Sequence, residues 1–171
     1  MKNFFCPKQS VLLLAIVSFG VVFSSCKKSS SSNDSGYFVQ ANANGTLVKY
    51  TGYTAAISTT LAGSYVLDIQ GQVSLTSSTD ALSAVITDAS PITTKTYTDQ
   101  MVNGSVQGIV NYYDHSGKQY SSALAATPAV PITITAITST YVTGTFSGTA
   151  VDISSGSTVT LTNGSFKVKV Q

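Results

Sequence analysis

Asp114, His115 and Ser116 stand side by side, and an acid, a histidine and a hydroxyl are the groups of a nucleophilic triad. His115 is the only histidine of the chain. The surrounding residues "DHSGKQ" have the composition of a turn, where neighbouring side chains point in different directions. Triad members normally come from separate elements. We therefore expect His115 to be a solvated turn residue, and we expect that the protein is not an enzyme.

The chain also has few residues of the types that bind metal ions or cofactors. The chain contains no glutamate, and its seven aspartates are scattered. The segment "DISSGS" (152–157) lacks the closely spaced carboxylates of a calcium loop. No glycine-rich phosphate loop follows a strand and opens a helix. We predict neither a metal site nor a cofactor.

Tyrosines around one predicted hairpin are the remaining candidates. Tyr112, Tyr113 and Tyr120 flank the turn at His115 and could form an aromatic platform for a sugar ring or for a partner protein. Cross-strand aromatic pairs that stabilise the hairpin are the alternative, and the one we favour. Because successive strand residues face opposite sides, only one of Tyr112 and Tyr113 can point into the core. The partner, glycan or protein, stays open.

Residues 1–25 are predicted to be an export signal. The first ten residues contain two lysines and no acid, and the run Val11–Phe23 contains no charge. Its 13 residues fit the roughly 7–15 of a signal-peptide apolar region. They fall short of the roughly 18 needed for a membrane-spanning helix.

Cys26 follows this run directly, after Ser24 and Ser25, and the arrangement resembles the lipobox of bacterial lipoproteins. The resemblance implies cleavage before Cys26 and acylation of its thiol, although Phe23 stands where leucine or valine is usual. Cys6 leaves with the signal, so the mature chain has no internal disulfide. We predict attachment of the protein to the outer membrane through lipid on Cys26, with the membrane as its first partner.

Residues 26–36 are predicted to be the acylated cysteine and a flexible serine-rich tether. A coil of ten residues spans roughly 17–20 Å. Lys27 and Lys28 occupy positions at which surface-exported lipoproteins carry acids. Both the periplasmic side of the outer membrane and the cell surface therefore remain open.

The mature chain is formally neutral, with seven lysines, seven aspartates and no arginine. A neutral chain lacks the clustered cations that nucleic-acid binding requires. The absence of glutamate and arginine, together with abundant threonine, favours strands over helices. Residues 37–171 are long enough for one domain with one core.

Period-two patterns predict short strands along this domain. Asn44-Gly45 between extended runs is the code for a tight type I′ hairpin. Residues 64–75 alternate apolar and polar side chains, and 104–114 are expected to form one strand that leads into the turn at His115. Residues 141–152 are expected to pair with 157–170, where Asn163-Gly164 forms a bulge or a second turn. Nine or ten such strands predict an all-β fold, an antiparallel two-sheet β-sandwich, with a lipocalin-like closed β-barrel as the alternative.

Three segments together carry a family resemblance. "VQANANGTLVKY", "GIVNYYDHSGKQY" and "VTGTFSGTAVD…STVTLTNGSFKV" resemble a family of small Bacteroidota lipoproteins with a domain of unknown function. The resemblance implies a β-rich domain at the outer membrane over most of residues 37–170. It implies no catalytic or binding residues.

Overall fold

The computed structural model describes residues 36–61, 63–74, 79–98, 101–102, 105–106, 108–125 and 130–171. Within these residues the secondary structure consists of thirteen β-strands and one short 3-10 turn, so the predicted all-β class is confirmed. No helix in this part of the chain is long and apolar enough to cross a membrane. The predicted signal, Cys26 and the tether up to residue 35 lie outside the described residues.

The strands vary in length from two to twelve residues. Their bounds are β1 Phe38–Ala43, β2 Thr46–Tyr50, β3 Tyr53–Leu61, β4 Ser64–Gln72, β5 Ala81–Asp88, β6 Thr96–Tyr97, β7 Met101–Val102, β8 Ser105–Val106, β9 Gly108–Tyr113, β10 Gln119–Ser121, β11 Ile132–Ile137, β12 Tyr141–Asp152 and β13 Thr158–Lys169. The 3-10 turn η1 spans Ser122–Leu124. The run 104–114, predicted as one strand, is divided into β8 and β9.

The predicted Asn44-Gly45 hairpin is confirmed. Asn44 has φ 48° and Gly45 has φ 86°, the two positive values that a type I′ turn requires. β1 and β2 pair antiparallel on either side of it. Asn44 also exchanges hydrogen bonds with Thr160, whose N–H donates to Asn44 Oδ1 at 2.9 Å. The turn is therefore tied to β13 as well as to its own two strands.

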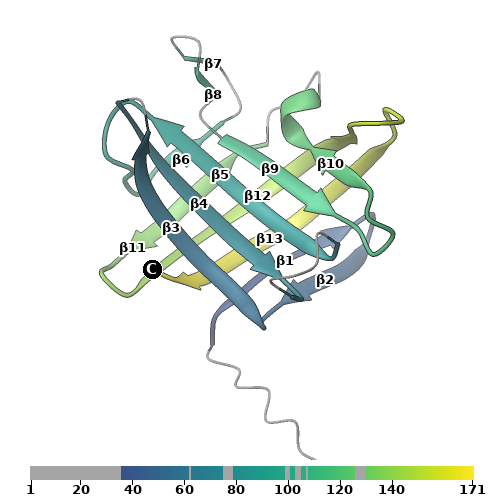
Figure 1. Ribbon diagram of the computed structural model, residues 1–171, viewed down its shortest axis with the longest axis horizontal. Helices are drawn as coiled ribbons and strands as arrows, with labels where there is room; N and C mark the ends of the chain where they lie inside the picture. The colour runs from purple at the N-terminus through teal and green to yellow at the C-terminus, as the bar shows by residue number, and fades with distance from the viewer. Residues whose placement is uncertain are drawn as a thin grey trace, which may run out of the picture. The chain divides into compact units, whose positions relative to one another are not determined.

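Eleven strands form one continuous sheet (Figure 1). Its order is β2-β1-β13-β12-β10-β9-β5-β4-β3, with β11 beside β12 and β6 beside β11, and every paired strand is antiparallel. The sheet curls until β3 meets the chain just beyond β13, where Ala56 bridges Val170 and the Gln171 N–H donates to Ala56 O at 3.1 Å. The sheet is thus barrel-like and nearly closed. A single bridge makes the closure, so the predicted alternatives of sandwich and barrel both stay open.

The core fills the inside of this sheet. Its largest fully buried side chains are Tyr97, Phe166, Ile69, Leu82, Ile86, Ile132, Ile134 and Leu161. Gly71 on β4 sets the spacing across the core, because a Cβ there would lie 2.5 Å from the Cβ of Val39 on β1. The inner faces of β4 and β1 therefore meet, and their outer faces lie on opposite sides of the domain. The described core and strands all belong to the unit Asp34–Gln171, which contains its own core.

The Asn163-Gly164 pair lies inside β13 and forms a bulge, the first of the two predicted alternatives. The register between β12 and β13 shifts between Phe146 and Gly148, and Asn163 adopts φ 52°. Glycine is required at 164 because a Cβ there would collide with Phe146. The bulge bends both long strands, as bulges in curved sheets do.

Candidate functional site

Four neighbouring strands, β3, β4, β5 and β9, present an outer face that combines amides, one carboxylate and two tyrosine rings. The strand register aligns their outward side chains in rows. The rows are Tyr53, Gln72, Ala81 and Tyr113; then Ala55, Gln70, Ser83 and Asn111; then Ile57, Asp68, Val85 and Ile109. We call the group Tyr53, Asp68, Gln70, Gln72, Ser83, Asn111 and Tyr113 the polar face.

Two hollows open on the polar face, each of about 340 Å³. The first lies over β3 and the end of the chain, and the second lies over β4, β5 and β9. They share Gln70 and Gln72, so both open toward the same amides. This volume is at the lower end of the range for small-molecule sites.

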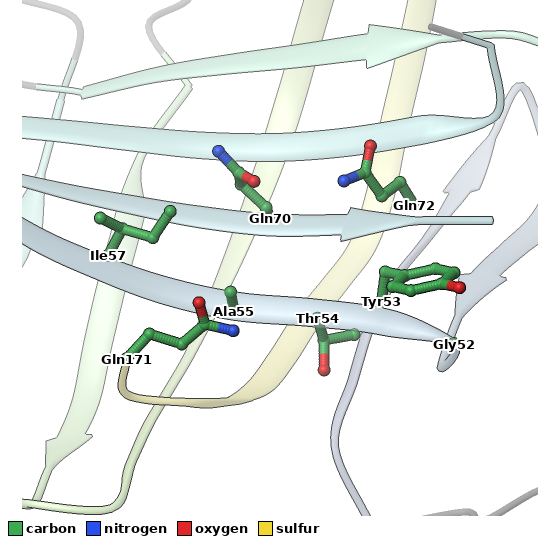
Figure 2. A pocket seen from close by; sticks show the side chains of 8 residues that line it. All are labelled: Gly52, Tyr53, Thr54, Ala55, Ile57, Gln70, Gln72 and Gln171. Atoms are coloured by element: carbon green, nitrogen blue, oxygen red, sulfur yellow. The ribbon is translucent and has the colours of Figure 1, made fainter. Parts of the chain in front are cut away.

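Figure 2 shows the first hollow from close by. The amides of Gln70 and Gln72 stand on one strand, and the ring of Tyr53 lies near Gln72 at one end of the hollow. Ile57 lies toward the other end, and Gln171 lies beside Ala55. The Gln171 side chain reaches this position because its backbone N–H is bound to Ala56 O. The hollow therefore combines an aromatic ring with several amides.

Asp68 lies in the second hollow and has an incomplete set of hydrogen bonds. Its Oδ2 accepts a hydrogen bond from Gln70 Nε2 at 2.6 Å. Its Oδ1 is buried and has no partner among the described residues. Burial raises the pKa of Asp68 above its ordinary value, and the Gln70 hydrogen bond only partly opposes this. A buried oxygen without a donor costs stability. A ligand that donates a hydrogen bond to Asp68 Oδ1, after a rotation of the side chain that exposes this atom, would offset that cost.

Tyrosines mark the two ends of the first row. Tyr53 is 44% exposed on β3, and Tyr113 is half-buried on β9. Three strand steps separate them, which is about 14 Å at the usual spacing of neighbouring strands. Between them stands Gln72, and the next row adds Gln70, Ser83 and Asn111. An elongated polar ligand with apolar patches would fit this row.

The three tyrosines predicted from the sequence are divided between the two sides of the sheet. Tyr112 is 8% exposed in the core, and its ring stacks on Tyr120 with centroids 5.9 Å apart and planes at 23°. This pair is the cross-strand aromatic contact that the sequence analysis favoured. Burial raises the pKa of Tyr112, as expected for a core phenol. Tyr113 alone lies on the polar face, so the three rings form no common platform.

The triad-like segment has a different geometry from a triad. Ser116 Oγ donates to Asp114 Oδ1 at 2.7 Å, whereas His115 Nδ1 lies 2.7 Å from Asp80 Oδ2. The hydroxyl is thus held by the acid and not by the histidine. The Ser116 and Lys118 amides also donate to Asp114, and these bonds lower its pKa.

Asp152, the first residue of the calcium-like segment, is bound within its own turn. Its Oδ1 accepts hydrogen bonds from the backbone N–H groups of Ser154 and Ser155, at 2.7 and 3.0 Å. These bonds lower its pKa. Over the described ranges no three histidine, cysteine or carboxylate groups gather where they could hold a metal ion.

Sequence reasoning missed most of the polar face, including Tyr53, Asp68, Gln70 and Gln72. A signal was present in "DIQGQ" (68–72), where every outward residue of a predicted strand is a carboxylate or an amide. Elsewhere the outward positions are mostly threonine, serine or lysine. The carboxylate of Asp68 accepts hydrogen bonds, and the amides of Gln70 and Gln72 both donate and accept, so these alternate positions offer both kinds of group to a polar ligand.

Comparisons with known proteins add no assignment. No family model matches the chain, and neither a curated protein nor a solved structure is significantly similar to it.

Proposed function

We propose that this protein is a non-enzymatic, lipid-anchored binding module of the cell envelope, and that its polar face binds a neutral oligosaccharide. The observation that carries the proposal is the unpartnered, buried Oδ1 of Asp68 beside the Gln70 amide. The anchor rests on the lipobox-like residues before Cys26. The resemblance to small Bacteroidota lipoproteins supports the same location.

Sugar chemistry matches the groups of the polar face. A sugar hydroxyl donates one hydrogen bond and accepts others, and Asp68 Oδ1 offers an acceptor where a donor is lacking. The amides of Gln70, Gln72 and Asn111 supply both kinds of group. The C–H face of a sugar ring packs on an aromatic ring, and Tyr53 and Tyr113 provide one at each end.

The charge of the hollows selects a neutral ligand. Among the described residues, the side chains that line them include one carboxylate, that of Asp68, and no lysine. An anionic sugar would approach Asp68 without a compensating cation, and like charges at short range are unfavourable. A neutral oligosaccharide avoids this repulsion and still satisfies Asp68 Oδ1.

The test is binding of the soluble unit Asp34–Gln171 to a glycan array, followed by calorimetric titration of the best ligand. Tyr53→Ala and Tyr113→Ala are each expected to weaken binding about tenfold, the effect of losing an aromatic contact of about 1.4 kcal/mol. Tyr65→Ala is the matched control, because Tyr65 is 38% exposed on β4 yet outside the polar face.

Equal affinity of Tyr53→Ala, Tyr113→Ala and Tyr65→Ala would place the glycan elsewhere on the domain. If no glycan on the array binds, and a protein partner is found whose binding Tyr113→Ala abolishes, the ligand of the polar face is a protein and not a sugar. The anchor is tested separately, by incorporation of labelled palmitate. Incorporation is expected in the wild-type chain and not in Cys26→Ala, and incorporation in both would disprove acylation at Cys26.

A further inference from the structure

Lysines of the described residues fall into two classes. Lys95 Nζ lies 2.6 Å from Asp88 Oδ2, and Lys118 Nζ lies 4.0 Å from Asp152 Oδ2. Within the described part of the chain, Lys49, Lys167 and Lys169 form no ion pair. These three charges are therefore not neutralised locally.

The strand register brings the three unpaired lysines onto one outer face. Lys49 on β2 is opposite Gln40 on β1. Lys167 on β13 is opposite Phe38, and Lys169 is opposite Tyr141 at the start of β12. Strands β1, β2 and β13 contain no aspartate at all. The described residues as a whole carry five lysines and five aspartates, but this face carries lysines alone.

Aromatic rings accompany the lysines. Lys167 Nζ lies 5.2 Å from the ring centre of Tyr141 and 5.9 Å from that of Tyr37. Lys49 Nζ lies 5.5 Å from the ring centre of Phe38. We call Tyr37, Phe38, Lys49, Tyr141, Lys167 and Lys169 the basic face. Leu47, 60% exposed, projects from β2 on the same side as Lys49.

The start of the folded unit lies within this face. Tyr37 belongs to it, and Cys26 stands eleven positions earlier in the chain. The tether predicted from the sequence for residues 26–36 would span roughly 17–20 Å on average. Acylated Cys26 would therefore keep the membrane within a short distance of the basic face. Lysines interleaved with amphipathic aromatic rings are the residue types that occupy the headgroup region of membranes.

We propose that the basic face docks on anionic phospholipid headgroups and orients the domain on the membrane. Lys49, Lys167 and Lys169 contact lipid phosphates, while Tyr37, Phe38 and Tyr141 enter the interface. The proposal rests on the anchor of the proposed function for proximity, but its chemistry does not depend on acylation or on the glycan. A tethered domain meets the surface at high effective concentration, so weak contacts suffice.

Orientation follows from the position of the basic face. The inner face of β4 meets that of β1 across Gly71, so the second hollow, over β4, β5 and β9, lies on the side opposite to the outer face of β1. The first hollow comes nearer to the basic face, because Gln171 lines it two positions after Lys169. Docking through β1 and β2 would direct the second hollow away from the lipid, so a ligand could reach Asp68 and Tyr113 without displacing the domain.

The test is co-sedimentation of the soluble unit Asp34–Gln171, which lacks Cys26, with lipid vesicles. Vesicles of phosphatidylcholine and phosphatidylglycerol, roughly three to one, are compared with pure phosphatidylcholine. A lysine near an anionic surface raises partitioning about fivefold. The triple variant Lys49→Gln/Lys167→Gln/Lys169→Gln is therefore expected to lose about a hundredfold of its partitioning into the anionic vesicles. High salt is expected to have a similar effect on the wild-type unit.

Lys118→Gln is the matched control, because Lys118 is half-exposed but lies beside Asp152, away from the basic face. Its partitioning is expected to equal that of the wild-type unit. Equal binding to neutral and anionic vesicles, or an equal loss in Lys118→Gln, would overturn the proposal. Tighter binding to a soluble polyanion such as heparin would also overturn it, in favour of an acidic polymer. Glycan titration of the same triple variant separates this outcome from that of the polar face, since its affinity for the glycan is expected to be unchanged.

Discussion

The polar face and the basic face are built from the same sheet in the same way, yet they carry different chemistry. On both, alternate side chains point outward while the others fill one core. On the polar face an acid is partly buried beside amides, and its oxygen lacks a donor. On the basic face lysines stay exposed over aromatic rings. The core constrains only the inner half of each strand, so the outer half is free to specialise.

The largest effect is expected from Gly71→Val, which would force apart the two layers that separate the faces. Its Cβ would lie 2.5 Å from Val39 Cβ, and overpacking of this kind costs about 1–3 kcal/mol or more. Urea denaturation measures the loss. Gly52→Ala is the control, since the nearest atom to a Cβ there is 3.7 Å away, and a change within about 0.5 kcal/mol is expected. An equally small change in Gly71→Val would contradict the observed packing.

Substitution of the inward Tyr112 on β9 should reduce stability, and substitution of the outward Tyr113 should reduce ligand binding. Tyr112→Ala removes a buried ring stacked on Tyr120 and is expected to cost about 3 kcal/mol of unfolding free energy. Tyr113→Ala is expected to change stability by less than about 1 kcal/mol while it weakens glycan binding. Thermal unfolding and calorimetric titration of both variants check this pair. Equal stability losses would place both rings in the core.

Asp68→Asn is expected to stabilise the fold by about 1 kcal/mol at neutral pH, because it removes a charge from a buried position. Asp68→Asn should also weaken glycan binding, so the substitution would increase stability and reduce function. The raised pKa of Asp68 means that the folded state favours the protonated carboxyl. The wild-type chain therefore recovers this stability as pH falls through the raised pKa, and the advantage of Asp68→Asn should vanish below it. If Asp68→Asn is more stable than the wild-type chain by the same amount at every pH, the buried charge of Asp68 is not the cause.

The smallest expected effect is the difference in stability between substituting a lysine that forms an ion pair and substituting one that does not. Lys95 lowers the pKa of Asp88 through a hydrogen bond at 2.6 Å, so this pair stabilises the fold only above the pKa of Asp88. Lys95→Gln is expected to cost about 0.5 kcal/mol at neutral pH and nothing at strongly acidic pH, as for other exposed pairs. Lys169→Gln, which breaks neither an ion pair nor a cation–π contact among the described residues, should leave the melting temperature unchanged. A matching loss in both variants would mean that Lys169 has a partner in the folded state.

Local patterns predicted much of this fold. The Asn44-Gly45 turn, the wet and dry sides of β4 and the pairing of β12 with β13 all follow from interactions between residues near in sequence. The alternation of Tyr112 and Tyr113 is of the same kind. The division of 104–114 into β8 and β9, and the bulge at Asn163, depend on which strand lies opposite. Local patterns specify a partner strand only where a short turn joins the two strands, as in β1–β2 and β12–β13.

The sequence by itself determined an all-β chain and the inner face of strands such as β4, because side-chain period and composition are local properties. Only the tertiary structure decided that Tyr53 and Tyr113, sixty positions apart, flank one row of amides, and that Lys49 shares a face with Lys167. Strand order brings these residues together, and that order is set by how the whole core packs. Both candidate surfaces therefore arise from the long-range pairing of strands whose individual patterns look alike.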